Sequence, residues 1–244
     1  MVNYITVVLI AKNADVTIKE CLNNLSRFKE VVLYLNNSTD KTKEIASVFS
    51  NVKIVEGEFL GFGPTKNHAA SFSTNDWILS LDTDEILNDK LIDEIEKQDY
   101  DDIKKIYFLN RDNYFLDIKT STNDFIARIY NKKHTKLNDN QVHEKVIIND
   151  NSTTYTLKNT FKHYNITDIN QTLTKMIQYT DLGAKDKRMC SFTIIIIRST
   201  FAFFKKYILK LHILDGWRGF VISITQANSV FYKYLKQYIN CQNK

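Results

Sequence analysis

Short apolar runs alternate with amphipathic segments over the first hundred residues. Residues 4–11, 31–35, 52–57 and 76–82 are continuous and rich in β-branched side chains, as in strands buried on both faces of a sheet. Segments with apolar side chains at helical spacing separate these runs, and a further helix is expected from about Asn88. The alternation predicts an α/β fold with a doubly wound, mainly parallel sheet.

The pattern changes in the second half of the chain. After about residue 104, the stretches KIYFLNRDNYF and FIARIYN alternate like half-exposed antiparallel strands, and from about residue 168 the apolar spacing becomes helical. The sequence therefore predicts a catalytic domain over residues 1–160 and a helical extension over residues 161–244. The apolar run FTIIII stops at Arg198, short of the roughly 20 residues that cross a bilayer, although such a helix could lie on a membrane surface.

The two halves of the chain also differ in net charge. The first 150 residues hold 19 basic and 24 acidic side chains, whereas the remainder holds 14 basic and 4 acidic ones. The basic part also carries many aromatic residues, which suits an anionic membrane surface or a polyanion. An alternative is that this part is a helical cap whose aromatic residues form its apolar core. The sequence contains no nucleic-acid-binding motif.

The cysteines and the N-terminal residues bear on the compartment. Cys21, Cys190 and Cys241 are odd in number and widely spaced, so we expect no disulfide framework, no zinc site and a reducing environment. The first fifteen residues lack the basic start and cleavage site of a signal peptide and are expected to form a strand.

A cluster of acidic residues ends the fourth predicted strand. In ILSLDTDEIL, Asp82, Asp84 and Glu85 fall within four positions and should repel one another unless something neutralises them. Carboxylates spaced like Asp82 and Asp84 could bind Mg²⁺ or Mn²⁺, which complete their shells with water and substrate phosphates. The alternative is a solvated acidic turn that caps the next helix.

Other polar residues are expected beside this cluster. Asn13 and Asn36 also follow predicted parallel strands, and ligands of such sheets bind outside the carboxyl ends of the strands. Asn13, Asn36 and Asp82 to Asp84 should therefore share one crevice.

In order, these segments resemble family 2 glycosyltransferases with a GT-A fold, which is Rossmann-like. The likeness rests on the strand and Asn turn at residues 5–13, the NNSTDKT loop, the Lys66–Asn67 pair and the LDTDE strand end. More narrowly, residues 125–146 (FIARIYNKKHTKLNDNQVHEKV), the later His163–Tyr164 pair, YTDLGA at 179–184 and LDGWRGF at 214–220 resemble the lipopolysaccharide core β-1,4-glucosyltransferases.

The resemblance implies a donor site for a UDP-sugar. Asp84 would bind the metal that bridges the diphosphate, and Asp82 would contact the ribose or a metal-bound water. Lys66 would help to neutralise the diphosphate and Asn67 would contact the nucleotide, unless they are a surface lysine and a cap residue. Asn13 would belong to the same donor site. The loop at Asn36 has Asn where the family has an Asp that binds uracil, and an Asn carbonyl can still accept that bond.

The resemblance also implies the groups that act on the acceptor. Glu144 would be the base that deprotonates the acceptor hydroxyl, with Asp139 in reserve, and His143 would contact the metal or a phosphate. Arg128 would hold a phosphate or the acceptor. Alternatively, His143 and Glu144 are an exposed strand pair, and Arg128 makes a salt bridge to a sheet neighbour.

The implied reaction is an inverting, Mn²⁺- or Mg²⁺-dependent transfer of a hexose, with glucose favoured. The donor would be UDP-glucose, and the acceptor a lipid-linked inner-core heptose of lipopolysaccharide or lipooligosaccharide. The enzyme would act in the cytoplasm as a peripheral protein of the inner membrane face. Another cell-surface glycan is an alternative acceptor, and a haloacid-dehalogenase-like phosphatase that uses Asp82 and Asp84 is a rival function. That rival needs a later Gly-Asp pair, which the sequence lacks. A nucleotidyltransferase would need a Gly-rich loop, and a membrane-binding module alone would leave the carboxylates unexplained.

Overall fold

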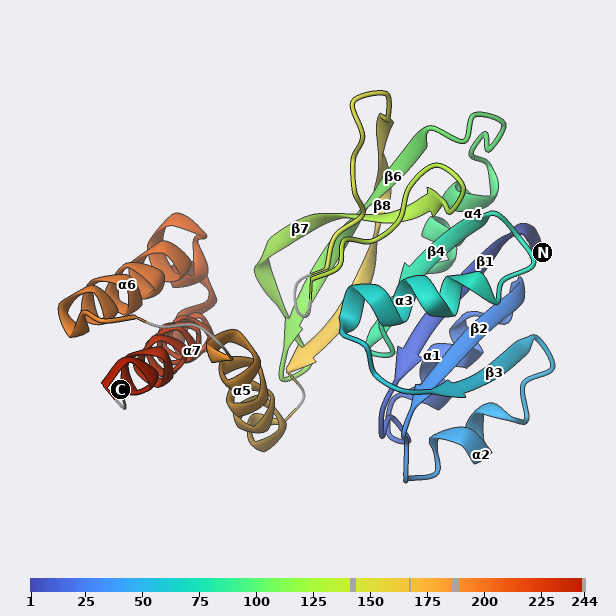
Figure 1. Cartoon of the computed structure of the whole chain (residues 1–244). Helices are drawn as coiled ribbons and strands as arrows, with labels where there is room; N and C mark the ends of the chain where they lie inside the picture. Colours follow the sequence, from blue (N-terminus) through green and yellow to red (C-terminus); the bar gives the residue numbers. More distant parts are fainter. Residues whose placement is uncertain (141–143, 167, 186–188, 243–244) are drawn as a thin grey trace. The chain divides into compact units, whose positions relative to one another are not determined.

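The strands of the chain form one mixed sheet (Figure 1). The computed structural model describes residues 1–140, 144–166, 168–185 and 189–242. Its described strands form an eight-stranded sheet in the order β3-β2-β1-β4-β7-β6-β8-β5. The strands are β1 (Val2–Ala11), β2 (Phe28–Asn36), β3 (Val52–Gly57), β4 (Trp77–Leu81), β5 (Glu85–Leu87), β6 (Lys105–Phe115), β7 (Ile118–Asn131) and β8 (Thr153–Ile166).

The first half of the sheet has the predicted α/β arrangement. Strand β1 runs parallel to β2 and β4, and β2 runs parallel to β3. Antiparallel pairs appear beyond β4, where β7 pairs antiparallel with β4 and β5 pairs antiparallel with β8. The connecting helices are α1 (Ile18–Asn24), α2 (Thr42–Ala46), α3 (Phe62–Ser71) and α4 (Asp89–Glu96). The predicted α/β class with a mainly parallel sheet is therefore confirmed.

Helices cover both faces of the parallel strands. Along β1, Val7 and Leu9 pack in one apolar core with α1 and α4, whereas Val8 and Ile10 pack in a second core with Ala69 of α3. Successive residues of a strand point to opposite faces, so a strand buried on both faces must be apolar throughout. The continuous runs in the sequence have this cause.

The chain divides into two compact units. Unit 1 comprises Met1–Asp112 and Asp124–His163, and unit 2 comprises Asn113–Asn123 and Tyr164–Lys244. The described helices of unit 2 are α5 (Ile169–Ala184), α6 (Phe192–Phe204), the π-helical turn η1 (Lys205–Leu209), the 3₁₀ turn η2 (His212–Asp215) and α7 (Gly216–Gln242). The predicted assignment of functions to residues 1–160 and 161–244 remains a prediction. No described helix is both long enough and apolar enough to cross a membrane.

The LDGWRGF segment of unit 2 joins the tip of the β6–β7 hairpin to α7. The Asp215 carboxylate accepts a hydrogen bond from the Ser121 backbone N–H at 2.7 Å, and its other oxygen lies 2.7 Å from Nδ1 of buried His212. A Cβ at Gly219 would lie 1.7 Å from the His212 carbonyl oxygen, so only glycine fits there. In this structure the segment has a structural role.

A disulfide in unit 2 contradicts the expectation of unpaired cysteines. Cys190, just before α6, is joined to Cys241 near the end of α7, with Cα atoms 5.7 Å apart. The α6–α7 packing brings together residues 51 apart in sequence, a proximity that Cys spacing alone does not reveal. The cysteine argument for a reducing compartment therefore fails, while Cys21 is buried in unit 1.

We predict that this disulfide stabilises unit 2. Replacing both cysteines (Cys190→Ser with Cys241→Ser) should lower the free energy of unfolding by about 2–4 kcal/mol, since the unfolded chain regains the freedom of the open loop. Denaturant titration followed by the helical circular-dichroism signal measures the change. Reductant should shift the wild type equally and leave the double variant unmoved. Identical wild-type midpoints with and without reductant would contradict the prediction.

Candidate active site

Two loops meet at the carboxyl edge of the parallel strands. Asn13, after β1, has a left-handed backbone with φ 52°, a conformation that Asn tolerates better than most residues. Its side-chain oxygen accepts a hydrogen bond from the Thr39 N–H at 2.8 Å, and its own N–H donates to the Ser38 hydroxyl at 3.1 Å. Asn36 is buried at the end of β2. The structure thus places Asn13 and Asn36 on one edge, where Asp82 follows β4.

Lys66 of α3 lies between two carboxylates. Its ammonium donates to Oδ1 of Asp82 and to Oε1 of Glu144, both at 2.6 Å. The side chain is 1% exposed, so Lys66 is not the surface lysine considered from the sequence. Burial by itself lowers the pKa of Lys66, but Asp82 and Glu144 outweigh burial and raise that pKa above its ordinary value. Lys66 is therefore a buried cation that ties the acidic turn to Glu144.

Arg128 of β7 neutralises the other side of the acidic turn. Its Nη2 lies 3.0 Å from Oδ2 of Asp82 and also donates to Oε1 of Glu85. Oε2 of Glu85 accepts a hydrogen bond from the Asp82 N–H at 3.0 Å. Arg111 lies 3.6 Å from Oε1 of the same carboxylate. We call Lys66, Asp82, Glu85 and Arg128 the ion cluster.

The ion cluster shifts the pKa values of its two carboxyl groups in opposite directions. Burial favours the neutral acid at Asp82, but Lys66 and Arg128 hold the pKa of Asp82 well below its usual range. Burial, helped by the charges of Asp82 and Asp84, raises the pKa of Glu85 to about 7 against the opposing charge of Arg128. Asp82 keeps 35% of its side chain exposed, so this carboxylate remains accessible from solvent.

Asp84 lies beside an imidazole. Its Oδ1 is 3.7 Å from Nε2 of His163, which β8 presents because Glu85 and His163 are register partners in the β5–β8 ladder. Next in the chain, Asn88 caps α4 by accepting from the Leu91 N–H at 2.8 Å, so the acidic residues themselves are not the helix cap. The two aspartates of the turn therefore have different neighbours. Asp82 contacts the cations Lys66 and Arg128, and Asp84 lies beside the imidazole of His163.

Residues 137–140 and 144–146 contact α3, and Glu144 reaches Lys66. Asn67 bonds both the Leu137 carbonyl (2.8 Å) and the Leu137 N–H (2.9 Å), and Leu137 forms a bridge with Val146. A Cβ at Gly63 would lie 1.8 Å from the Asn138 carbonyl oxygen, so α3 and this segment touch through a glycine. The observed bonds give Asn67 a positioning role for the segment.

The remaining candidates for proton transfer differ in their placement. Asp139 is 73% exposed and lies 3.5 Å from Lys136. His143 lies outside the described residues. The structure thus joins Glu144, Lys66, Asp82 and Arg128 in one network and leaves Asp139 on the surface.

Glu85 and His163 were not among the residues that the sequence singled out for the site. The sequence signal for Glu85 was its place next to Asp84, and for His163 its place in the His-Tyr pair. The antiparallel pairing of β5 with β8 makes both part of the site, and that pairing joins segments 78 positions apart.

The described residues fit a divalent cation that is shared with a ligand. They contain no group of three or more His, Cys, Asp or Glu side chains able to hold a metal by themselves. Asp84 and His163 offer one carboxylate oxygen and one imidazole nitrogen. Mg²⁺ and Mn²⁺ accept a small protein donor set when water and phosphate oxygens complete the shell.

The sequence matches a known family over more than half of its length. Residues 6–146 match the model described as Glycosyl transferase family 2. An uncharacterized glycosyltransferase of Rickettsia bellii is 30% identical over 252 residues, covering 95% of this chain and 85% of that protein. One from Rickettsia prowazekii is 29% identical over 257 residues, covering 95% and 86%.

Solved structures with a partly similar arrangement include TarS of S. aureus and a synthase of Mycobacterium tuberculosis. TarS is 13% identical with a TM-score of 0.46, covering 98% of this chain and 92% of its own. The glucosyl-3-phosphoglycerate synthase, solved with Mn²⁺, UDP and phosphoglyceric acid, is 19% identical with a TM-score of 0.34. It covers 46% of this chain and 43% of its own.

We predict that Lys66 is required for stability as well as for the geometry of the site. Lys66→Met should lower the free energy of unfolding by about 3–5 kcal/mol, because it leaves two carboxylates beside a half-neutralised cluster. Urea denaturation measures the loss. Lys43→Met is the matched control, since Lys43 pairs with Glu56 on the surface with side chains 61% and 58% exposed. That variant should lose about 1 kcal/mol or less. Equal losses in the two variants would overturn the structural role of Lys66.

Proposed function

This chain belongs to glycosyl transferase family 2, and on that basis we propose that it transfers a hexose with inversion from a UDP-sugar to a saccharide acceptor. Glucose is the proposed sugar, and an inner-core heptose of lipopolysaccharide or lipooligosaccharide the proposed acceptor. The observation that carries the proposal is the ion cluster, which fixes Asp82 at the strand ends and brings Glu144 to the same place.

The donor site is proposed at the carboxyl edge of β1, β2 and β4. Asn13 and Asn36 lie on this edge and would contact the nucleoside, and the exposed part of Asp82 would contact the ribose. The cations Lys66 and Arg128 pair with Asp82 and Glu85. Their first role is therefore to hold the acidic turn in place, and their positive field would also favour a diphosphate.

Asp84 and His163 are the residues proposed to hold Mn²⁺ or Mg²⁺. His143, which the family resemblance assigns to the metal or a phosphate, lies outside the described residues and stays a candidate. A bound divalent ion supplies charge neutralisation for a leaving diphosphate. The 3.7 Å approach of Asp84 Oδ1 to Nε2 of His163 supports this assignment, because it brings two metal-binding side chains together.

Glu144 is the proposed base. The acceptor hydroxyl would lose its proton to a Glu144 oxygen as its own oxygen bonds to the anomeric carbon. The bond from that carbon to the diphosphate oxygen breaks, and the configuration inverts. Lys66 binds Oε1 of Glu144, which orients the carboxylate and leaves Oε2 for the proton.

The acceptor end is proposed to involve the helical part of the chain. Residues 161–244 are basic and aromatic, which suits a lipid-linked acceptor and a peripheral position on the inner face of the cytoplasmic membrane. Another cell-surface glycan is the alternative acceptor. Membership of family 2 replaces the phosphatase hypothesis.

Transfer from a panel of UDP-sugars tests the proposal. The purified chain is incubated with Mn²⁺, each UDP-sugar in turn, and lipopolysaccharide truncated at the inner-core heptose, and products are read by mass spectrometry. Addition of one hexose supports the proposal. Transfer to a capsule fragment but not to the truncated lipopolysaccharide would indicate that the acceptor is another cell-surface glycan. If no UDP-sugar is transferred or hydrolysed, the proposal that the donor is a UDP-sugar is wrong.

We predict that Glu144 and Asp139 differ sharply in their effect on turnover. Glu144→Gln should lower kcat by about 10²- to 10⁴-fold, because the amide keeps the shape of the side chain and cannot accept the proton. Asp139→Asn is the matched control and should leave kcat nearly unchanged, since this side chain is on the surface. Initial rates of sugar transfer measure both. A large loss in Asp139→Asn with an active Glu144→Gln would reverse the assignment.

Replacing His163 should weaken the binding of Mn²⁺. We expect His163→Asn to raise the Mn²⁺ concentration that half-saturates the UDP complex by about tenfold or more, because one of two protein ligands is lost. Electron paramagnetic resonance of free Mn²⁺ reports binding without any turnover. His134→Asn is the control, because that imidazole bonds Ser152 away from the ion cluster. Unchanged Mn²⁺ affinity in His163→Asn would exclude this ligand.

A further inference from the structure

Helix α6 carries its apolar side chains on the outside. Within this fully described helix of thirteen residues, Ile195 is the buried one. Ile194, Ile197, Phe201, Phe204 and, in η1, Ile208 follow one another at intervals of three or four, and they are between 41% and 61% exposed. Such intervals set side chains on one face of a helix. We call these five residues the apolar stripe.

The turn that follows the helix extends this surface. Leu209 and Leu214 are 69% and 70% exposed, and Leu211 and Trp217 also have more than half of their side chains exposed. Scattered apolar side chains are ordinary on a protein surface, but a contiguous patch of this kind marks a place where something binds. The stripe and the turn belong to the same unit of the chain.

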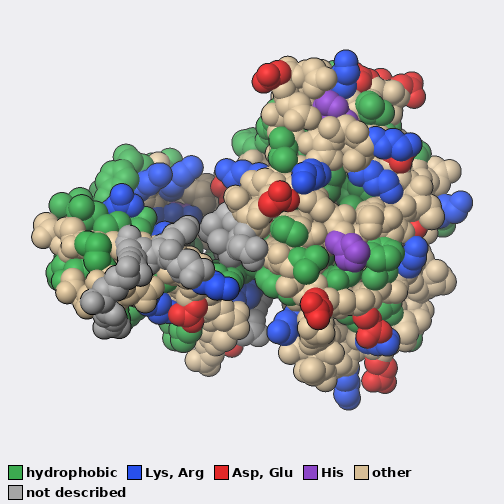
Figure 2. Space-filling view, viewed as in Figure 1, with side chains coloured by type: hydrophobic (Ala, Val, Ile, Leu, Met, Phe, Trp, Pro, Cys, Tyr) green, Lys and Arg blue, Asp and Glu red, His purple; other side chains and the backbone are tan. Residues whose placement is uncertain are grey.

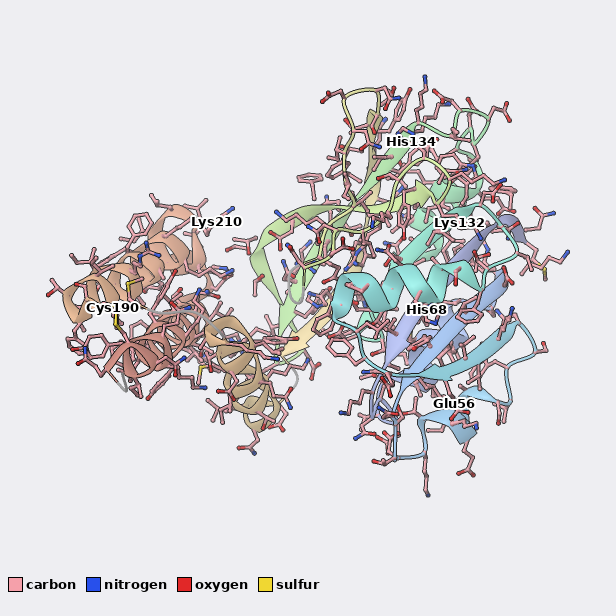
Figure 3. The ribbon with its side chains drawn as sticks, viewed as in Figure 1. Glu56, His68, Lys132, His134, Cys190 and Lys210 are labelled. Atoms are coloured by element: carbon pink, nitrogen blue, oxygen red, sulfur yellow. A yellow bond between two sulfur atoms is a disulfide. The ribbon has the colours of Figure 1, made fainter. Side chains whose placement is uncertain are left out.

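Basic residues accompany the apolar stripe. Residues 192–220 contain five Lys and Arg and one acid, Asp215, which is already bonded to His212 and Ser121. Lys205 and Lys210 are exposed beside the stripe, and the guanidinium of Arg218 lies 4.6 Å from the Trp217 ring. Figure 2 shows hydrophobic and basic side chains together over this part of the chain, and Figure 3 labels Lys210 and Cys190 toward opposite ends of α6.

The positive charge beside the apolar stripe indicates which kind of partner it can bind. In a symmetric dimer the same patch would face itself, so five positive charges would oppose five others. An occupant with an apolar interior and an anionic surface matches both features. A bilayer that contains anionic lipids has this composition, and lysine ammonium groups reach its headgroups while their methylene stems lie along the apolar surface.

We propose that the apolar stripe of α6, with the turn at residues 208–217, lies in the interface of an anionic bilayer, and that Lys205 and Lys210 bind its headgroups. The proposal deepens the membrane association proposed above and rests on it. It assigns that association to one helix of unit 2 and to a stated lipid charge.

Vesicle sedimentation of the full chain tests the proposal without donor, metal or acceptor. The wild type should bind phosphatidylcholine vesicles that contain phosphatidylglycerol and bind pure phosphatidylcholine weakly. Ile197→Ser, Phe201→Ser and Phe204→Ser combined should reduce binding by about tenfold or more, because apolar burial is lost. The control is Val16→Ser with Val48→Ser, which removes apolar side chains that are 83% and 79% exposed in unit 1. It should bind like the wild type.

A second pair of variants separates charge from apolar burial. Lys205→Gln with Lys210→Gln should weaken binding to anionic vesicles by about 30-fold, and Lys90→Gln with Lys97→Gln, in α4 and at its C-cap, should not. Binding of UDP in the presence of Mn²⁺ at the proposed donor site of unit 1 should persist in every variant, so a failure of vesicle binding is distinct from a failure of the transferase proposal. Equal binding by wild type and stripe variant would overturn the proposal. A wild-type dimer without vesicle binding, dissociated by the stripe substitutions, would also overturn it in favour of self-association.

Discussion

The structure of the site depends on one constraint, the neutralisation of an acidic turn at the end of a buried strand. Glu85 is buried from water and Asp82 is partly so, and a buried carboxylate is stable only when cations and hydrogen bonds surround it. Lys66 from α3 and Arg128 from β7 supply the charge, and the Asp82 N–H supplies a further bond. Three elements from distant parts of the sequence are thereby fixed against one another.

The same constraint gives the neighbouring residues their separate roles. Asp82 is held by two cations, whereas Asp84 lies 3.7 Å from His163, the pair proposed to hold the metal. Lys66 also reaches Glu144, so a carboxylate 62 positions further along the chain than Asp82 enters the same crevice. The family assignment agrees with this arrangement, since glycosyl transfer needs a nucleotide site and a base within reach of one another.

The sequence predicted the parts of this structure that local pattern controls. Continuous apolar runs located β1 to β4, and the loops after these strands located Asn13, Asn36 and Asp82 at one edge. The burial of Lys66 and the pairing of β5 with β8 were not predictable, because both depend on contacts between distant segments. For the same reason Glu85 and His163 were missed, and the Cys190–Cys241 disulfide emerged only from the packing of α6 and α7.

The central claim is a donor site for a uridine diphosphate at Asp82 and Asp84. Calorimetric titration of UDP, with and without Mn²⁺, into the wild type and Asp84→Ala tests it most directly. The account predicts that UDP binds in the presence of Mn²⁺, and that removal of the ion or of the Asp84 carboxylate abolishes or greatly weakens binding. UDP binding of equal strength in all four titrations would contradict the metal assignment. No binding under any condition would contradict the uridine donor itself.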